Sequence, residues 1–256
     1  MDNVKITEIE GYEIIEYPEK NIYVIEKILD DELCKDLINV IDLNCLDKLT
    51  YFKNQNVKCY ISQLENLLEE SDELYYSFST EEFEYKRIIT NINDGNLYTN
   101  NLHGLCKNDI NKILNEINAK TRIMQKIFSK INNTITLKYN SGFTLRKIYG
   151  KTRIHSDGPN SGMNRKTGLK YINDQTMDKL NVVFIRELSC IFALNDDFTG
   201  GMIRFPEQNV NIKFTKGSVV CFPPFWTHPH EVSEIDNDKY RYTISTWFCN
   251  KHEIFS

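Results

Sequence analysis

The chain has 256 residues, of which 41% are hydrophobic and 26% are charged, and its formal net charge at pH 7 is −5. This composition is that of one sizeable globular domain, and it excludes wholesale disorder and a fibrous fold. The negative net charge argues against a nucleic-acid partner, because a phosphate-binding surface needs an excess of Lys and Arg.

The start of the chain is rich in acidic residues and lacks the basic and apolar stretches of a signal peptide. No apolar run reaches the roughly 18 residues of a membrane span. The seven cysteines are an odd number without a CxxC pair, which favours reduced, buried thiols. We therefore expect a cytoplasmic protein without a membrane partner. The abundance of Asn, Ile and Lys suggests AT-rich coding, as in a viral protein of the host cytoplasm or a microbial one.

The N-terminal part predicts a short strand followed by a helix. Residues 22–25 (IYVI) are an apolar run, and Asp30 can cap a helix that extends to Ile41. In this helix apolar residues recur every four positions, at Leu33, Leu37 and Ile41.

Two more amphipathic helices are expected before residue 132, at residues 63–76 and 108–131. The apolar face of the second comprises Ile110, Ile113, Leu114, Ile117, Met124, Ile127, Phe128 and Ile131. Residues 79–105 are expected to be irregular, with an Asn-Asp-Gly turn at 93–95.

Short alternating segments follow residue 132, separated by Gly, Pro, Asn and Asp. They are TITLKYN, FTLRKIY, VVFIRELSCIFALND, MIRF, VNIKF, SVVCF and KYRYTISTWF. Helices first and antiparallel strands second favour an α+β fold in which a helical layer covers one sheet of a β-sandwich or jelly roll. We expect one integrated domain, with residues 1–131 as the supporting strand and helical layer and residues 132–256 as the core. The polar stretch 158–180 predicts either a lid or a surface insertion.

A group of metal-binding residue types occurs in the second half. His155 and Asp157 are two residues apart, so on an extended segment they point to the same side, and a distant strand can add a third ligand. Two imidazoles and one carboxylate leave positions of Fe(II) open for a cosubstrate and O₂. The His-x-Asp triplet at 155–157 alone is weak evidence for a metal site, because most such triplets arise by chance in turns.

Arg241 follows His230 by eleven residues, in a segment that reads as a strand. Alternation puts Arg241, Thr243, Ser245 and Trp247 on one face. A guanidinium can bind a carboxylate through two hydrogen bonds. Lys239 shares that face, although a solvated lysine at the start of the strand is the simpler interpretation.

These motifs together resemble the double-stranded β-helix core of the prolyl-4-hydroxylase-like Fe(II)/2-oxoglutarate-dependent dioxygenases. The resemblance covers about residues 132–250 and includes RELSCIFALNDDFTGGMIRFPE and GSVVCFPPFWTHPHEV. It implies a jelly-roll, cupin-like fold with Gly200-Gly201 in a turn of the barrel.

The resemblance also implies roles for individual residues. His155, Asp157 and His230 would bind iron, Arg241 would anchor the distal carboxylate of 2-oxoglutarate, Ser245 would assist Arg241, and Tyr149 would contact 2-oxoglutarate or simply pack in the barrel mouth. His228 competes with His230 for the third ligand position, and the spacing to the basic residue favours His230. His228 would then lie next to the ligands or at the entrance.

The remaining basic side chains receive simpler interpretations. His103 and His252 are expected at the surface or in packing. Arg153 and Arg186 could reach the site, but arginines beside strands more often form surface pairs.

The implied activity is hydroxylation of a protein or peptide residue, with a prolyl residue favoured, and release of succinate and CO₂. Its cofactors would be Fe(II), 2-oxoglutarate and O₂, with ascorbate as a supporting reductant. Asp157 favours hydroxylation over halogenation, because related halogenases have a small residue at that position. Trp247 stands where nucleic-acid demethylases of the superfamily have a second arginine. A lysyl or small-molecule hydroxylase, a non-catalytic cupin-like metal- or partner-binding protein and a structural scaffold are the alternatives.

Overall fold

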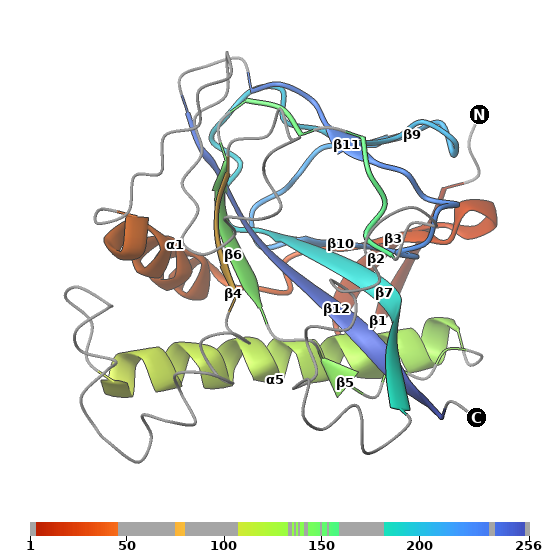
Figure 1. The fold of residues 1–256 in the computed structure, drawn as a ribbon, viewed down its shortest axis with the longest axis horizontal. Helices are drawn as coiled ribbons and strands as arrows, with labels where there is room; N and C mark the ends of the chain where they lie inside the picture. Colours follow the sequence, from red (N-terminus) through yellow and green to blue (C-terminus); the bar gives the residue numbers. More distant parts are fainter. Residues whose placement is uncertain are drawn as a thin grey trace.

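In the part of the chain that the computed structural model describes, two antiparallel sheets are combined with two α-helices and one short 3-10 helix (Figure 1). It describes residues 4–45, 75–79, 107–132, 135, 137, 139–140, 143–148, 150–152, 154–158, 182–235 and 239–253. A nine-stranded sheet has the order β1-β2-β3-β10-β7-β12-β6-β4, with β5 also paired to β12, and a three-stranded sheet has the order β11-β8-β9. The α+β class and the double-stranded β-helix arrangement are thus confirmed.

The strands of the large sheet come from both halves of the chain. They are β1 (Lys5–Ile9), β2 (Tyr12–Tyr17), β3 (Ile22–Ile25), β4 (Tyr75–Ser79), β5 (Tyr139–Asn140), β6 (Thr144–Ile148), β7 (Val182–Ala193), β10 (Val219–Phe222) and β12 (Arg241–Glu253). The small sheet consists of β8 (Ile203–Phe205), β9 (Val210–Ile212) and β11 (Glu231–Val232). All the segments predicted as strands after residue 132 contain a strand, although TITLKYN contributes only its last two residues.

Two features of the N-terminal half differ from the expectations. The hairpin of β1 and β2 was not predicted; its turn places Glu10 and Gly11 at φ 55° and 78°, as tight hairpin turns require. The prediction of a helix at residues 63–76 is wrong for its last two residues, because Tyr75 and Tyr76 belong to β4 and pair with β6. Residues 63–74 and 80–105, including the turn expected at 93–95, lie outside the described residues.

Helices α1 (Asp31–Cys45) and α5 (Lys107–Ile131) cover one face of the large sheet (Figure 1). The carboxylate of Asp30 accepts a hydrogen bond from the Leu33 amide at 2.9 Å, so the predicted cap is confirmed. The apolar faces of both helices pack on the sheet through buried side chains: Leu33, Leu37, Ile41, Ile113, Ile117, Met124, Ile127 and Phe128. None of the helices in the described part of the chain is long and apolar enough to span a bilayer.

Strand alternation divides the core into two layers. Val219 and Cys221 of β10 face the helices, whereas Val220 and Phe222 face the small sheet. The inner layer continues through β8 and β9, where Phe205 is fully buried. The inner face of the large sheet therefore supplies the side chains that can reach an interior site.

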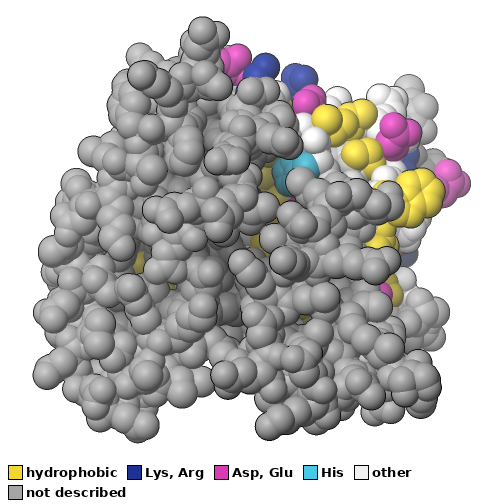
Figure 2. Space-filling view, viewed as in Figure 1, with side chains coloured by type: hydrophobic (Ala, Val, Ile, Leu, Met, Phe, Trp, Pro, Cys, Tyr) yellow, Lys and Arg dark blue, Asp and Glu magenta, His cyan; other side chains and the backbone are white. Residues whose placement is uncertain are grey.

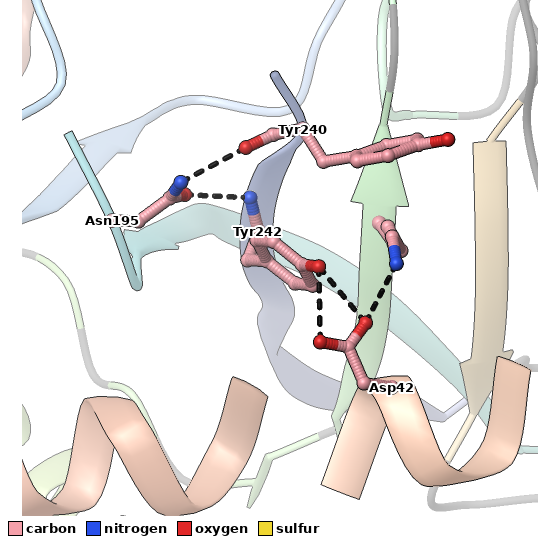
Figure 3. Close-up of polar contacts among 5 residues, drawn as sticks. Asp42, Asn195, Tyr240 and Tyr242 are labelled. Atoms are coloured by element: carbon pink, nitrogen blue, oxygen red, sulfur yellow. Dashed lines mark hydrogen bonds and ion pairs between the residues drawn. The ribbon is translucent and has the colours of Figure 1, made fainter. Parts of the chain in front are cut away.

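A polar cluster attaches α1 to the outer face of the sheet (Figure 3). Both carboxylate oxygens of Asp42 accept hydrogen bonds from the Tyr242 hydroxyl, at 2.8 and 3.1 Å, and Oδ1 also accepts one from Lys147 at 2.7 Å. The ammonium of Lys147 lies 4.4 Å from the centre of the Tyr240 ring. These contacts connect α1 to β6 and to the start of β12.

Candidate metal centre

His155 and His230 lie opposite each other on two paired segments of chain. Each backbone amide donates to the other residue's carbonyl, at 2.9 and 2.8 Å, and the ring centroids are 4.5 Å apart. The pairing extends to the Thr152 amide, which donates to the Val232 carbonyl at 3.0 Å. Thr152 and His155 therefore pair with Val232 of β11 and with His230 just before it, and this pairing brings two histidines that are distant in sequence into contact.

Asp157 completes a group of three possible ligands. Its Oδ1 lies 3.6 Å from Nε2 of His155 and 3.9 Å from Nε2 of His230. One ligand atom from each residue can be chosen so that all three lie within 4.8 Å of one another. Two imidazole nitrogens and one carboxylate oxygen suit Fe(II), so the donor set fits the implied metal.

The environment of Asp157 keeps its carboxyl group ionised. Burial opposes ionisation, but the imidazoles of His230 and His155 and the guanidinium of Arg186 outweigh burial and hold the pKa well below its ordinary value. A deprotonated carboxylate is the form that binds a metal.

His230 is held in a form ready for metal binding. Its Nδ1–H donates to the carbonyl oxygen of His228 at 3.1 Å, which leaves Nε2 without a proton and directed at Asp157. Burial, with the nearby His155, lowers its pKa to about 4, so the ring is neutral at pH 7. The rings of Phe205 and Phe222 pack around it, at centroid distances of 5.7 and 4.6 Å.

His228 points to a different part of the molecule. Its Nε2–H donates to the carbonyl oxygen of Lys20 at 2.8 Å, and its Nδ1 accepts from the Thr227 hydroxyl at 2.9 Å. His228 lies in a turn, where strand alternation does not apply, so its two-residue spacing from His230 does not place both rings on one side. The structure thus brings His230, not His228, to His155 and Asp157.

One side of the metal centre reaches the surface. The side chain of His155 is 38% exposed, whereas those of Asp157 and His230 are 11% and 2% exposed. Ile154 and Trp226 are exposed apolar residues before each histidine-containing segment. In Figure 2 a histidine is visible at the surface beside apolar side chains.

Arg241 begins β12 with its side chain buried on the inner face, opposite to Tyr242 on the outer face. The Asn195 side chain holds the main chain on both sides of it, donating to the Tyr240 carbonyl at 2.9 Å and accepting from the Tyr242 amide at 2.8 Å (Figure 3). Ser245 is buried on the same face, and its hydroxyl has no hydrogen-bond partner among the described residues. A buried guanidinium and an available hydroxyl suit an anionic ligand.

Other candidate residues do not join this group. Lys239 is exposed and forms an ion pair with Asp197 at 2.7 Å, in line with a solvated lysine. Tyr149, Arg153 and His103 lie outside the described residues, as do the side chain of His252 and residues 159–180 of the stretch expected to be a lid or a surface insertion. Their roles stay predictions.

Arg186 and Trp247 contact Asp157 directly; the sequence had left open that Arg186 reaches the site, but it did not predict the contact of Trp247. Trp247 Nε1 donates to Asp157 Oδ2 at 3.1 Å, and Arg186 Nη1 donates to the Asp157 carbonyl oxygen at 2.7 Å. The guanidinium of Arg186 lies 3.9 Å from the centre of the Trp247 ring. Of the two interpretations given for Arg186, the structure thus favours the one in which it reaches the site. The only indication in the sequence that Trp247 lies near the metal centre was its place on the same strand face as Arg241.

Comparisons with known proteins give a family match for part of the chain and similar folds among solved structures. Residues 148–249 match the family described as the 2OG-Fe(II) oxygenase superfamily. The viral collagen prolyl hydroxylase of Paramecium bursaria Chlorella virus-1, solved with 2OG, has a TM-score of 0.51 and 14% identity, covering 90% of this chain and 96% of that one. A prolyl hydroxylase from Trichoplax adhaerens, solved with a hypoxia inducible factor peptide fragment, has a TM-score of 0.50 and 12% identity, with coverages of 90% and 83%. Such identities show a common fold, and no curated protein sequence matches the chain.

Proposed function

We propose that the protein, a 2-oxoglutarate-dependent dioxygenase whose residues 148–249 belong to the 2OG-Fe(II) oxygenase superfamily, hydroxylates a residue of a protein or peptide, with prolyl residues as the first candidates. The reaction consumes O₂ and 2-oxoglutarate and releases succinate and CO₂. The observation that carries the proposal is the convergence of His155, Asp157 and His230 within 4.8 Å of one another.

In this proposal the three side chains hold Fe(II), which when bound supplies the oxygen activation that protein side chains cannot perform. Asp157 and His230 form the buried side of the centre, and the more exposed His155 marks the side from which cosubstrate and substrate enter. The aromatic rings around His230 exclude water from the buried side.

Arg241 anchors the distal carboxylate of 2-oxoglutarate in the same proposal, assisted by the Ser245 hydroxyl and by Tyr149. Its burial on the inner face of the large sheet, which it shares with the Ser245 hydroxyl, supports this role, because a guanidinium can bind a carboxylate through two hydrogen bonds. Alanine at position 241 should weaken 2-oxoglutarate binding by at least about 30-fold, as loss of one member of a buried charge pair does. Calorimetric titration with 2-oxoglutarate in the presence of Mn(II) measures the effect. Lys239→Ala, which removes an exposed lysine two positions earlier, is the control and should bind normally.

The substrate is tested with peptides. Proline-containing peptides come first because the two similar solved structures are named as prolyl hydroxylases, and lysine-containing peptides and small molecules follow. The protein is incubated with Fe(II), 2-oxoglutarate, O₂ and ascorbate, and mass spectrometry detects the addition of one oxygen atom together with succinate formation. Omitting ascorbate shows whether the reductant supports turnover.

Variants separate catalysis from background oxidation. His155→Ala and Asp157→Ala should abolish product formation, whereas Lys5→Ala, which removes a surface ion pair with Glu16, should retain it. Turnover of wild-type rate in either ligand variant would contradict the proposed centre. Iron binding without product from any substrate class would instead favour the non-catalytic cupin-like alternative, and absence of iron binding would favour a scaffold. The cytoplasmic location stays a proposal.

A further inference from the structure

We propose that Trp247 and Arg186 are positioning residues that fix the Asp157 carboxylate, so that Oδ1 alone is presented to the metal. The inference rests on the metal centre of the proposed function. It assigns different tasks to the two carboxylate oxygens and places both positioning residues on strands of the large sheet.

The two oxygens of Asp157 have different surroundings. Oδ1 faces both candidate histidine ligands, at 3.6 Å from His155 Nε2 and 3.9 Å from His230 Nε2. Oδ2 instead accepts the indole N–H of Trp247 at 3.1 Å. The torsion that turns a carboxylate is soft and broad, so the carboxylate of a free aspartate exchanges or shares its oxygens readily. The indole donor restricts that rotation.

Arg186 holds the same aspartate and its tryptophan partner together. It donates to the main-chain oxygen of Asp157 at 2.7 Å, and its guanidinium lies 3.9 Å from the Trp247 ring centre. A guanidinium stacked on an indole is attracted to the ring face. One side chain of β7 therefore fixes the backbone of Asp157 and also the ring that fixes its carboxylate.

The sheet supplies a firm base for this unit. Trp247 lies in β12 opposite Ser189 of β7, and Arg186 lies opposite Cys249, with a register shift between Phe248 and Cys249. A bulge of this kind redirects side chains relative to regular pairing. Trp247 is almost fully buried, so water competes little for its N–H.

A fixed carboxylate has a consequence for the metal. If both oxygens bound, the aspartate would occupy a position that the cosubstrate or O₂ needs. A hydrogen bond from Trp247 to Oδ2 favours binding through Oδ1 alone. Hydrogen-bonding partners of metal ligands typically change metal affinity by about 10- to 100-fold.

The test compares the metal affinity of conservative variants with that of the wild-type protein, and it does not depend on enzymatic turnover. Trp247→Phe keeps an aromatic ring for Arg186 and removes the N–H donor. We expect its affinity for Co(II), measured by calorimetry in the absence of 2-oxoglutarate, to fall by about 10-fold or more. The visible spectrum of bound Co(II) should also change, because the aspartate then coordinates differently. Trp226→Phe alters the exposed tryptophan and should leave both readouts unchanged.

Arg186→Met provides a second, independent variant that leaves the indole in place. It should weaken Co(II) binding in the same direction, and its effect should be smaller in the Trp247→Phe background, because the two residues act as one unit. Unchanged Co(II) affinity and spectrum in folded Trp247→Phe would overturn the proposal. If that variant does not fold, unchanged values in Arg186→Met would overturn it.

His155→Ala separates this inference from the proposed function. If His155→Ala loses Co(II) while both positioning variants bind it normally, the metal centre stands and the positioning role fails. If His155→Ala also binds Co(II) normally, the metal centre itself fails.

Discussion

His228 and His230 stand two residues apart, yet their rings have different partners. His228 is committed to the Lys20 carbonyl through Nε2, whereas His230 uses Nδ1 for a hydrogen bond and keeps Nε2 directed at Asp157. Which histidine serves as a ligand is therefore decided by hydrogen bonding in the folded chain and not by sequence spacing.

Alanine variants at the two histidines should separate these roles. His230→Ala removes a proposed ligand and should weaken Co(II) binding by more than about 100-fold, which exceeds the effect of losing a hydrogen-bond partner of a ligand. His228→Ala retains the main-chain oxygen that holds His230, so its Co(II) affinity should change by less than about 10-fold. The reverse order in calorimetric titrations would assign His228 as the ligand.

At the level of elements, the start of β10 meets the connection between β3 and α1 at Gly217. Its φ of 80° lies in the left-handed region, and a side-chain carbon there would overlap the Leu29 carbonyl oxygen. The Gly217 carbonyl also accepts the Leu29 amide at 3.0 Å. Only glycine allows the two chain segments to approach this closely.

Gly217→Ala should therefore lower the free energy of unfolding much more than Gly11→Ala does. Gly11 has a similar φ of 78°, but nothing occupies the space around it. Gly11→Ala should cost about 1 kcal/mol of unfolding free energy from backbone strain alone. Gly217→Ala should cost about 3 kcal/mol or more, since overlap adds to strain. Urea denaturation measures both, and equal losses would contradict the close approach.

The whole molecule should lose stability at alkaline pH through the cluster that attaches α1. Burial is the main cause that raises the pKa of Tyr242 to about 12, with the Asp42 hydrogen bond adding to it. An unfolded tyrosine ionises near pH 10, so the unfolded chain releases this proton first. The Tyr242 hydroxyl therefore makes its full contribution to the free energy of unfolding below about pH 10, and this contribution is lost as the pH rises toward about 12.

Tyr242→Phe should remove this part of the alkaline loss. Other buried groups, including Cys34 with a pKa raised by burial to about 11, lose stability in the same direction. The informative quantity is thus the difference between wild type and variant in unfolding free energy across pH 9 to about 12. That difference should shrink as pH rises, and a constant difference would contradict the role of Tyr242. Tyr12→Phe in the β1–β2 hairpin serves as the control.

Much of the fold and the centre of the site could be predicted from the sequence. Apolar and polar residues alternate clearly in the strands after residue 132. The order of His155, Asp157, His230 and Arg241 is that of the dioxygenase motif. Strand β1 was missed because it is an edge strand with mostly exposed side chains, which leaves little hydrophobic periodicity. Strand β4 depends on pairing with β6, a contact between segments far apart in sequence.

The supporting contacts of Asp157 could not be predicted for a similar reason. Arg186 and Trp247 lie on β7 and β12, whereas Asp157 lies outside the strands, and only the pairing of β7 with β12 brings Arg186 and Trp247 together. Hydrogen-bond partners of this kind leave no local pattern in the sequence.

In the proposed function, one iron ion binds between His155, Asp157 and His230. Anomalous X-ray diffraction at the iron edge, from crystals grown without oxygen and with Fe(II) and 2-oxoglutarate, locates this ion. We predict a single iron peak at bonding distance from Nε2 of both histidines and from Asp157 Oδ1, with the distal carboxylate of 2-oxoglutarate against Arg241. An iron peak at any other group of side chains, or no ordered iron at all, would show that these three residues do not form the iron site.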